Sequence, residues 1–438
     1  MKKFNINNQL QEVIDDLNKR NFDKALEKLK ILYQKDSQNY LIIKLFASIF
    51  ARKKDWDNAI YYYNKLLSFK NENFKVFNDI GVAQFKIGKI NQSIETYQKS
   101  IDNNPNVVAY CNLGIAYSEI GDYVNSVKNY IAALKIDQNN HLILGYLIKS
   151  FIYFFPTNIN DHPLLNANFR IKQLSKNNKT IKLNELENIK KILIESENIT
   201  KSLNLGFFLN ETQIFRSNSK NLNCDRHFKV FNRFNIIPKF CFACYKVQIY
   251  LNNVVDLIKL HFLFDDLNLK NNNIRKCLVE IRPTIQGNYK GIIYCDGLSE
   301  AEDILKKIDA IMLENKFKGF KVKIRHGCAE FYSSYPKYEK INFNGEQEIK
   351  YNPNWSDKEK IIDSENSARS GIDKKIRSKS LNGLSLPDIM VIKNWIGYAD
   401  IIGDNSYKLI YDKKIENTFI EKILKSQIDF RKKEFETF

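Results

Sequence analysis

The chain has 438 residues, of which 44% are hydrophobic, and its formal net charge at pH 7 is +18. This length predicts two or three domains, and the hydrophobic content is sufficient for sizeable cores. The seven cysteines are an odd number, which argues for free thiols or metal ligands and against a disulfide framework. With only five histidines, acid–base chemistry would have to depend on carboxylates or cysteines.

The first third of the chain is repetitive. Small residues between apolar neighbours recur at Ala25, Ala59, Ser93 and Ser126, so that successive positions are about 34 residues apart. A fixed period in this range is typical of a solenoid, in which each repeat buries its apolar face only against its neighbours.

Each repeat predicts two short helices. In the third repeat, apolar residues recur at helical spacing over Val76–Lys86 and again over Ile90–Ile101, with Gly88 between the two runs. Asn104 and Pro105 then predict the end of the second helix.

This pattern resembles the tetratricopeptide repeat family over about a third of the chain. The residues that carry the resemblance are Ile80, Gly81, Phe85, Ser93, Tyr97, Ser100 and Pro105 in the third repeat, and Leu113, Gly114, Tyr117, Ser126, Tyr130 and Ala133 in the fourth. The second repeat matches less well, because Ala47 stands where the family has glycine. The resemblance implies an all-α solenoid over residues 1–155.

The resemblance also implies that a protein or peptide partner binds in a concave groove. Four polar residues on the first helices of the third and fourth repeats are candidates for that groove: Asn78, Gln84, Asn112 and Tyr117. Two alternatives stay open, namely that the solenoid is only a spacer and that these asparagines are isolated surface residues.

The second half predicts an α+β domain after a helical connector. We expect the connector over residues 156–223, the α+β domain over 224–345, and an irregular and helical extension over 346–438. The predicted strands are Lys246–Leu251, Lys276–Arg282, Tyr289–Cys295 and Lys321–Arg325, and the predicted helices are Asn253–Leu267 and Ser299–Met312. The resulting order, βαββαβ, predicts a ferredoxin-like core with a four-stranded antiparallel sheet and two helices on one face.

Two pairs of potential ligands at short spacing predict a metal site. Cys224 and His227 are separated by two residues, as are Cys241 and Cys244. Three cysteines and one histidine are an accepted ligand set for structural zinc, which makes Zn²⁺ the candidate cofactor. The alternative is core packing: if Phe240–Leu251 were one continuous strand, Cys241 and Cys244 would point to opposite faces and could not share an ion.

A second thiol cluster could form at the predicted sheet. Cys277, Cys295 and Cys328 lie on predicted strands or just after one, and His326 is close to Cys328 in sequence. Cysteine is also a common core residue, and this interpretation is favoured for Cys277 and Cys295.

We expect a cytoplasmic protein-interaction scaffold or adaptor whose α+β domain has a second, unknown role. One alternative is an enzyme that acts on a protein substrate recruited by the repeats. A less favoured alternative is RNA or other nucleic-acid binding through a basic sheet surface of Arg282, Lys290, Lys321, Lys323 and Arg325. The apolar cluster Ile148–Phe155 is too short to span a membrane, so no transmembrane segment is expected.

Overall fold

The computed structural model describes residues 6–69, 73–156, 159–177, 185–203, 210–217, 222–283, 285–340, 348–367, 380–411 and 417–437. The described residues form two compact units, one made by the chain up to Tyr146 with Asn366 and Ser367, and the other by the remaining later segments. The second unit begins at Leu147. Each unit is considered by itself.

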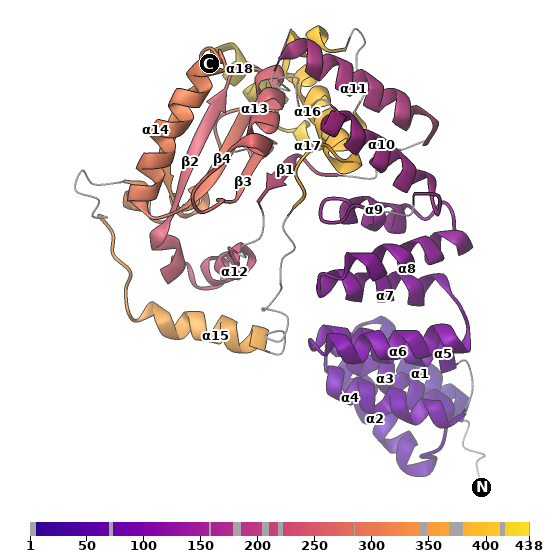
Figure 1. The fold of residues 1–438 in the computed structure, drawn as a ribbon. Coiled ribbons are helices and arrows are strands. Elements are labelled where there is room, and N and C mark those ends of the chain that lie inside the picture. The colour runs from indigo at the N-terminus through magenta and orange to yellow at the C-terminus, as the bar shows by residue number, and fades with distance from the viewer. Residues whose placement is uncertain are drawn as a thin grey trace. The chain divides into compact units, whose positions relative to one another are not determined.

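The first unit consists of stacked helix pairs (Figure 1). Its helices are α1 (Ile6–Asn18), α2 (Phe22–Lys35), α3 (Tyr40–Lys53), α4 (Trp56–Leu66), α5 (Asn73–Lys86), α6 (Ile90–Asn103), α7 (Val107–Glu119) and α8 (Tyr123–Ile136), followed by the start of α9 (His141–Ser150). We call α1, α3, α5 and α7 the A helices and α2, α4, α6 and α8 the B helices. This is the predicted solenoid, and it includes the weakly matching first repeat.

The glycines of the third and fourth repeats allow the two helices of a pair to approach closely. A Cβ atom added to Gly81 would lie 2.6 Å from a ring carbon of Tyr97, and one added to Gly114 would lie 2.6 Å from a ring carbon of Tyr130. Each tyrosine therefore packs directly on the backbone of the opposing A helix. The repeat pattern of glycine and tyrosine is a packing requirement.

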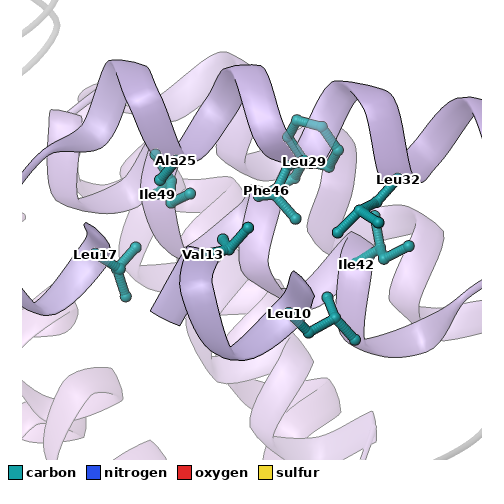
Figure 2. Packing of buried hydrophobic residues seen from close by; sticks show 9 residues of the cluster. All are labelled: Leu10, Val13, Leu17, Ala25, Leu29, Leu32, Ile42, Phe46 and Ile49. Atoms are coloured by element: carbon teal, nitrogen blue, oxygen red, sulfur yellow. The ribbon is translucent and has the colours of Figure 1, made fainter. Parts of the chain in front are cut away.

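Apolar residues of successive helices form the core of the first unit. Figure 2 shows the cluster at its beginning, where side chains from α1, α2 and α3 interlock. The buried members are Leu10, Val13, Leu17, Ala25, Leu29, Leu32, Ile42, Phe46 and Ile49. Because α3 belongs to the next repeat, the first repeat buries its apolar face against its neighbour, as expected for a solenoid.

The second unit is built around an antiparallel sheet. Its strands are β1 (Gln213–Arg216), β2 (Cys244–Leu251), β3 (Arg275–Val279), β4 (Tyr289–Asp296) and β5 (Lys321–His326), in the order β1-β3-β4-β2-β5. Helix α13 (Val254–Asp266) connects β2 to β3, and α14 (Leu298–Glu314) connects β4 to β5. Both helices pack against β2 and β4. The described sheet thus has five strands and not the predicted four, because β1 pairs with β3.

Alternation along β2 separates the two faces of this sheet. Tyr245, Val247, Ile249 and Leu251 are buried, whereas the residues between them are half-buried. On β4, Gly291 lies opposite Ile249, and a Cβ atom there would come within 2.4 Å of Leu260 on α13. The buried face of β2 is therefore the face that α13 covers.

The predicted connector and the described C-terminal extension, apart from Asn366 and Ser367, belong to the same unit as the sheet. Their helices are α10 (Pro163–Asn177), α11 (Leu186–Thr200), α12 (Cys224–Phe234), α15 (Trp355–Ser367), α16 (Leu386–Ile402), α17 (Thr418–Leu424) and α18 (Ile428–Thr437). Helix α16 is docked through a buried ion network in which Arg216 of β1 contacts both Asp265 of α13 and Asp388 of α16. No helix among the described segments is long and apolar enough to cross a membrane.

Candidate functional site

The A helices of the third and fourth repeats contact each other directly, and two predicted groove residues meet there. The side-chain nitrogen of Asn112 on α7 donates a hydrogen bond of 2.9 Å to Oδ1 of Asn78 on α5. The two other predicted groove residues lie elsewhere on the same helices. Tyr117 packs into the apolar cluster around Tyr97, and Oε1 of Gln84 is buried with no hydrogen-bond partner among the described residues.

Charged residues that the sequence analysis missed extend this polar row. Asp79 follows Asn78 on α5, and its charged neighbour is Lys44 on α3. The Asp79 side chain is exposed, but the surrounding helices remove part of the water around its carboxyl group. This desolvation raises the pKa of Asp79 to about 6. The Asn78 amide and Lys44 lower the same pKa by a smaller amount. Lys44 and Asn78 occupy equivalent positions of successive repeats, so the period itself could have identified Lys44. Asn112 is equivalent to Asp79, because the third and fourth repeats are 33 residues apart.

Apolar side chains are exposed at one recurring position next to this row. Counting from Leu41 by one repeat at a time gives Lys75, Val108 and Leu142. Leu41 is 51% exposed, Val108 57% and Leu142 62%. Leu41 lies three residues before Lys44, and Val108 lies four residues before Asn112, so each pair shares one face of its helix.

These residues define what we call the A-helix surface: Leu41, Lys44, Lys75, Asn78, Asp79, Val108 and Asn112. Exposed apolar side chains scattered singly over a protein need no explanation. Here they recur at one repeat position beside a row of amide and charged groups. The A-helix surface can therefore contact apolar side chains and backbone amides of a bound chain.

In the second unit, the predicted pair Cys241 and Cys244 lies at a turn. Cys241 belongs to a 3₁₀ turn, Lys239–Ala243, and β2 begins only at Cys244, whose backbone N–H donates to the carbonyl of Cys241. The alternative in which Phe240–Leu251 forms one continuous strand is thus wrong. In a 3₁₀ turn, residues three apart lie on the same side, so the thiols of Cys241 and Cys244 can face a common point.

A third thiol lies beside this pair. The backbone N–H of Gly327 donates a hydrogen bond of 2.7 Å to the carbonyl of Cys244, and Cys328 follows immediately. Gly327 has a φ of +57°, and a Cβ atom there would overlap the hydroxyl of Tyr338, so the turn requires glycine. Cys328 and Cys241 pack in the same apolar cluster.

Helix α12 brings the fourth thiol. Cys224, Phe228 and Phe231 follow one stripe of the helix, and both rings pack on Phe331, three residues after Cys328. Each of the six pairs among Cys224, Cys241, Cys244 and Cys328 is close enough for charge on one thiol to raise the pKa of the other. We call these four residues the thiol cluster.

Burial is the main cause of the raised pKa values of Cys224, Cys241 and Cys244, and it raises the pKa of Cys244 to about 11. The neighbouring cation is Lys246, whose Nζ donates a hydrogen bond of 3.1 Å to the sulfur of Cys328. Burial by itself lowers the pKa of Lys246. The nearby acidic groups, of which Cys328 has the largest effect, outweigh burial and hold the pKa of Lys246 well above its usual value. Lys276 is a second cation near Cys224 and Cys328.

His227, the predicted fourth ligand, lies on the adjacent stripe of α12 with Val230. Its ring stacks on Phe240 at a centroid distance of 5.1 Å, and its charged neighbours are Arg226, Glu359 and Asp363. Burial lowers the pKa of His227 to about 4. Among the described residues, no three His, Cys, Asp or Glu side chains have the separations of metal ligands.

The second predicted cluster is not assembled around one point. Cys277 lies opposite Gly291, whereas Cys295 lies opposite Tyr245, so four residues of β4, or about 13 Å, separate the two positions. The nitrogens of His326 lie 2.7 Å from the carbonyl of Tyr338 and 3.1 Å from that of Phe242. Both ring nitrogens are thus engaged by the backbone, and Cys328 lies with the thiol cluster.

The predicted basic sheet surface is partly neutralised. Lys290 is fully buried and lies 2.9 Å from Glu280. Arg282 pairs with Glu280 and Glu330, and Arg325 pairs with Glu339. Three of the five predicted cations therefore have carboxylate partners, which weakens the attraction of this surface for phosphate groups.

Comparison with known proteins supports the repeat assignment. Residues 74–107 and 107–140 each match the model of the tetratricopeptide repeat family. The general transcriptional corepressor trfA of Dictyostelium discoideum is 22% identical over 118 residues, which are 26% of this chain. The match spans only 8% of the length of that relative.

Two solved structures are similar to part of the chain. A crystal structure of the MamA protein is 17% identical and covers 45% of this chain and 97% of its own, with a TM-score of 0.31. The structure of YrrB, described as a TPR protein with an unusual peptide-binding site, is 14% identical and covers 44% of this chain and 85% of its own, with a TM-score of 0.30.

Proposed function

We propose, from the two tetratricopeptide repeats within residues 74–140, that this protein is an interaction scaffold whose A-helix surface binds an extended segment of a partner protein. The observation that carries this proposal is the recurrence of exposed apolar side chains at one repeat position, Leu41 and Val108, beside the polar row. Exposed apolar groups rimmed by polar ones are typical of protein-binding surfaces.

The polar row would recognise the backbone of the bound segment. An asparagine side chain carries both a donor and an acceptor, as a peptide group does. The hydrogen bond between Asn112 and Asn78 holds both amides in a fixed orientation before binding, which lowers the entropy lost on association. Lys44 and Asp79 add one charge of each sign, and Lys75 adds a second positive charge to the A-helix surface. We therefore expect a partner segment with apolar residues and a small negative net charge.

For the second unit we interpret the part from β2 to β5 as a ferredoxin-like core. The order β2-α13-β3-β4-α14-β5 and the antiparallel neighbours β3-β4-β2-β5 support this interpretation. We propose that this unit carries a second binding function of the scaffold.

A site-specific photocrosslinking experiment tests the use of the A-helix surface. A photoreactive amino acid is placed at Val108 on α7 or, as the matched control, at Val124 on α8, in the full chain in its host cell. The two valines belong to the same repeat and are 57% and 60% exposed, but one is on an A helix and the other on a B helix.

We expect a discrete crosslinked protein from position 108 that is absent from position 124. The crosslinked peptide, identified by mass spectrometry, should be an extended segment of the partner. Equal crosslinking from the two positions, or crosslinking from position 124 alone, would contradict the proposal.

A further inference from the structure

We propose that Cys224, Cys241, Cys244 and Cys328 together bind one Zn²⁺ ion as a structural four-sulfur site, in which Cys328 replaces the predicted ligand His227. This site is independent of the A-helix surface, and every ligand belongs to the second unit.

Backbone geometry and ring packing bring together the segments that carry the four thiols. The 3₁₀ turn at Lys239–Ala243 puts Cys241 and Cys244 on one side. The hydrogen bond from Gly327 to the carbonyl of Cys244 fixes the start of the next ligand loop. The packing of Phe228 and Phe231 on Phe331 fixes α12, and therefore Cys224, against that same loop.

We expect the site to close on an ion by rotation of the four cysteine side chains. The described thiols do not have the separations of bound ligands, but each Cys side chain has a single rotatable bond between backbone and sulfur. That bond has three staggered rotamers. Cys224 and Cys244 are half-buried, so their sulfurs can move without opening a packed core.

The surroundings suit the charge that the site would carry. A Zn²⁺ ion with four thiolates has two excess negative charges, which are costly to bury unless cations or hydrogen-bond donors lie close by. Lys246 donates its hydrogen bond to the sulfur of Cys328, and Lys276 is the second nearby cation. A donor that orients and neutralises a ligand from the outer shell is what a metal site of this charge requires.

Sulfur selects the class of metal. Four thiolates in a tetrahedral arrangement favour Zn²⁺ over the harder Mg²⁺ and Ca²⁺. Four protein ligands leave no position for water, so the ion would not catalyse. Its effect would be to join α12, the 3₁₀ turn, β2 and the loop after β5.

Zinc K-edge X-ray absorption of the purified full chain tests the ligand set without any mutation. We expect about one zinc ion per chain and four Zn–S distances of about 2.3 Å with no nitrogen ligand. Three sulfurs and one nitrogen would overturn the assignment of Cys328. A chain purified without zinc that also fails to develop the thiolate charge-transfer absorption of Co²⁺ on titration would overturn the site itself.

Variants separate the two candidate fourth ligands. Cys328→Ser should lose the zinc, measured as metal per chain, whereas His227→Ala should keep it. Cys111→Ser in the solenoid is the control for a buried cysteine outside the thiol cluster. If Cys328→Ser fails to fold, the absorption spectrum of His227→Ala still decides, because an unchanged four-sulfur signal supports the proposal and loss of the metal contradicts it.

Discussion

Asn112 and Asn78 are hydrogen-bonded to each other across two repeats, with a donor–acceptor distance of 2.9 Å. A hydrogen bond between partly buried neutral groups contributes about 0.5–1 kcal/mol. In a double-mutant cycle of Asn78→Ala and Asn112→Ala, urea unfolding should therefore give a coupling free energy of about that size. Asn103→Ala, which removes an exposed bond within one helix, should show no coupling to either variant. Additive effects of the first two variants would mean that the bond does not form in solution.

Asp79 should make the stability of the solenoid depend on pH. Its folded-state pKa of about 6 lies above the ordinary value of 3.8, so the folded state binds more protons between these values. The free energy of unfolding should then fall as pH rises from about 4 to about 6. Because Asp79 is exposed, the effect should stay below about 1 kcal/mol.

Asp79→Asn should remove this fall and leave the protein slightly more stable at pH 7. Urea unfolding at a series of pH values measures the effect. The control is Asp102→Asn, an exposed carboxylate on α6. A slope that persists in Asp79→Asn would show that another group causes it.

Gly81→Ala should destabilise the third repeat. The new Cβ atom would lie 2.6 Å from the ring of Tyr97, and overpacking of this kind costs about 1–3 kcal/mol, more than alanine gains in helix propensity. The equivalent residue one repeat earlier is Ala47, and there the reverse change Ala47→Gly should also destabilise, by about 1 kcal/mol. Thermal unfolding measures both, and stabilisation by Gly81→Ala would refute the close approach of the helices.

Glu280→Gln should be among the most damaging changes in the second unit. Its carboxylate is 1% exposed and neutralises Lys290, which is fully buried, as well as Arg282. Removal of one partner of a buried ion pair costs about 3–5 kcal/mol, because the other charge stays buried. The control Glu302→Gln, on the exposed side of α14, should change the free energy of unfolding by less than about 0.5 kcal/mol. Equal effects of the two changes would contradict the role of Glu280.

The solenoid could be predicted because its signal is local and repeated. Gly81 packs on Tyr97 within one helix pair, and Gly114 packs on Tyr130 in the next. Because the same residue types recur with the repeat period, the pattern can be recognised in the sequence. Four strands of the sheet were also predictable from alternation or short apolar runs. Strand β1 was not, because Gln213–Arg216 is very short and is a strand only through its pairing with β3.

The candidate sites were predictable only where the candidate ligands are neighbours in sequence. Cys241 and Cys244 form a recognisable pair, but Cys328 comes much later in the chain. Cys328 lies near Cys241 and Cys244 because β5 pairs with β2 in a register that places His326 opposite Tyr245. The spacing of cysteines in the sequence does not reveal this strand pairing. The sequence predicts His227 as the partner of Cys224 because the two are close in sequence, yet they follow different stripes of α12.

The affinity of the crosslinked partner segment for the full chain tests the scaffold function most directly. Val108→Asp should weaken binding at least about tenfold in isothermal titration calorimetry, since burial of a valine contributes about 1.5 kcal/mol and an unpaired charge adds to the loss. Val124→Asp, equally exposed on the B helix of the same repeat, should leave the dissociation constant within about twofold. Unchanged binding by Val108→Asp, or an equal loss in both variants, would contradict binding at the A-helix surface.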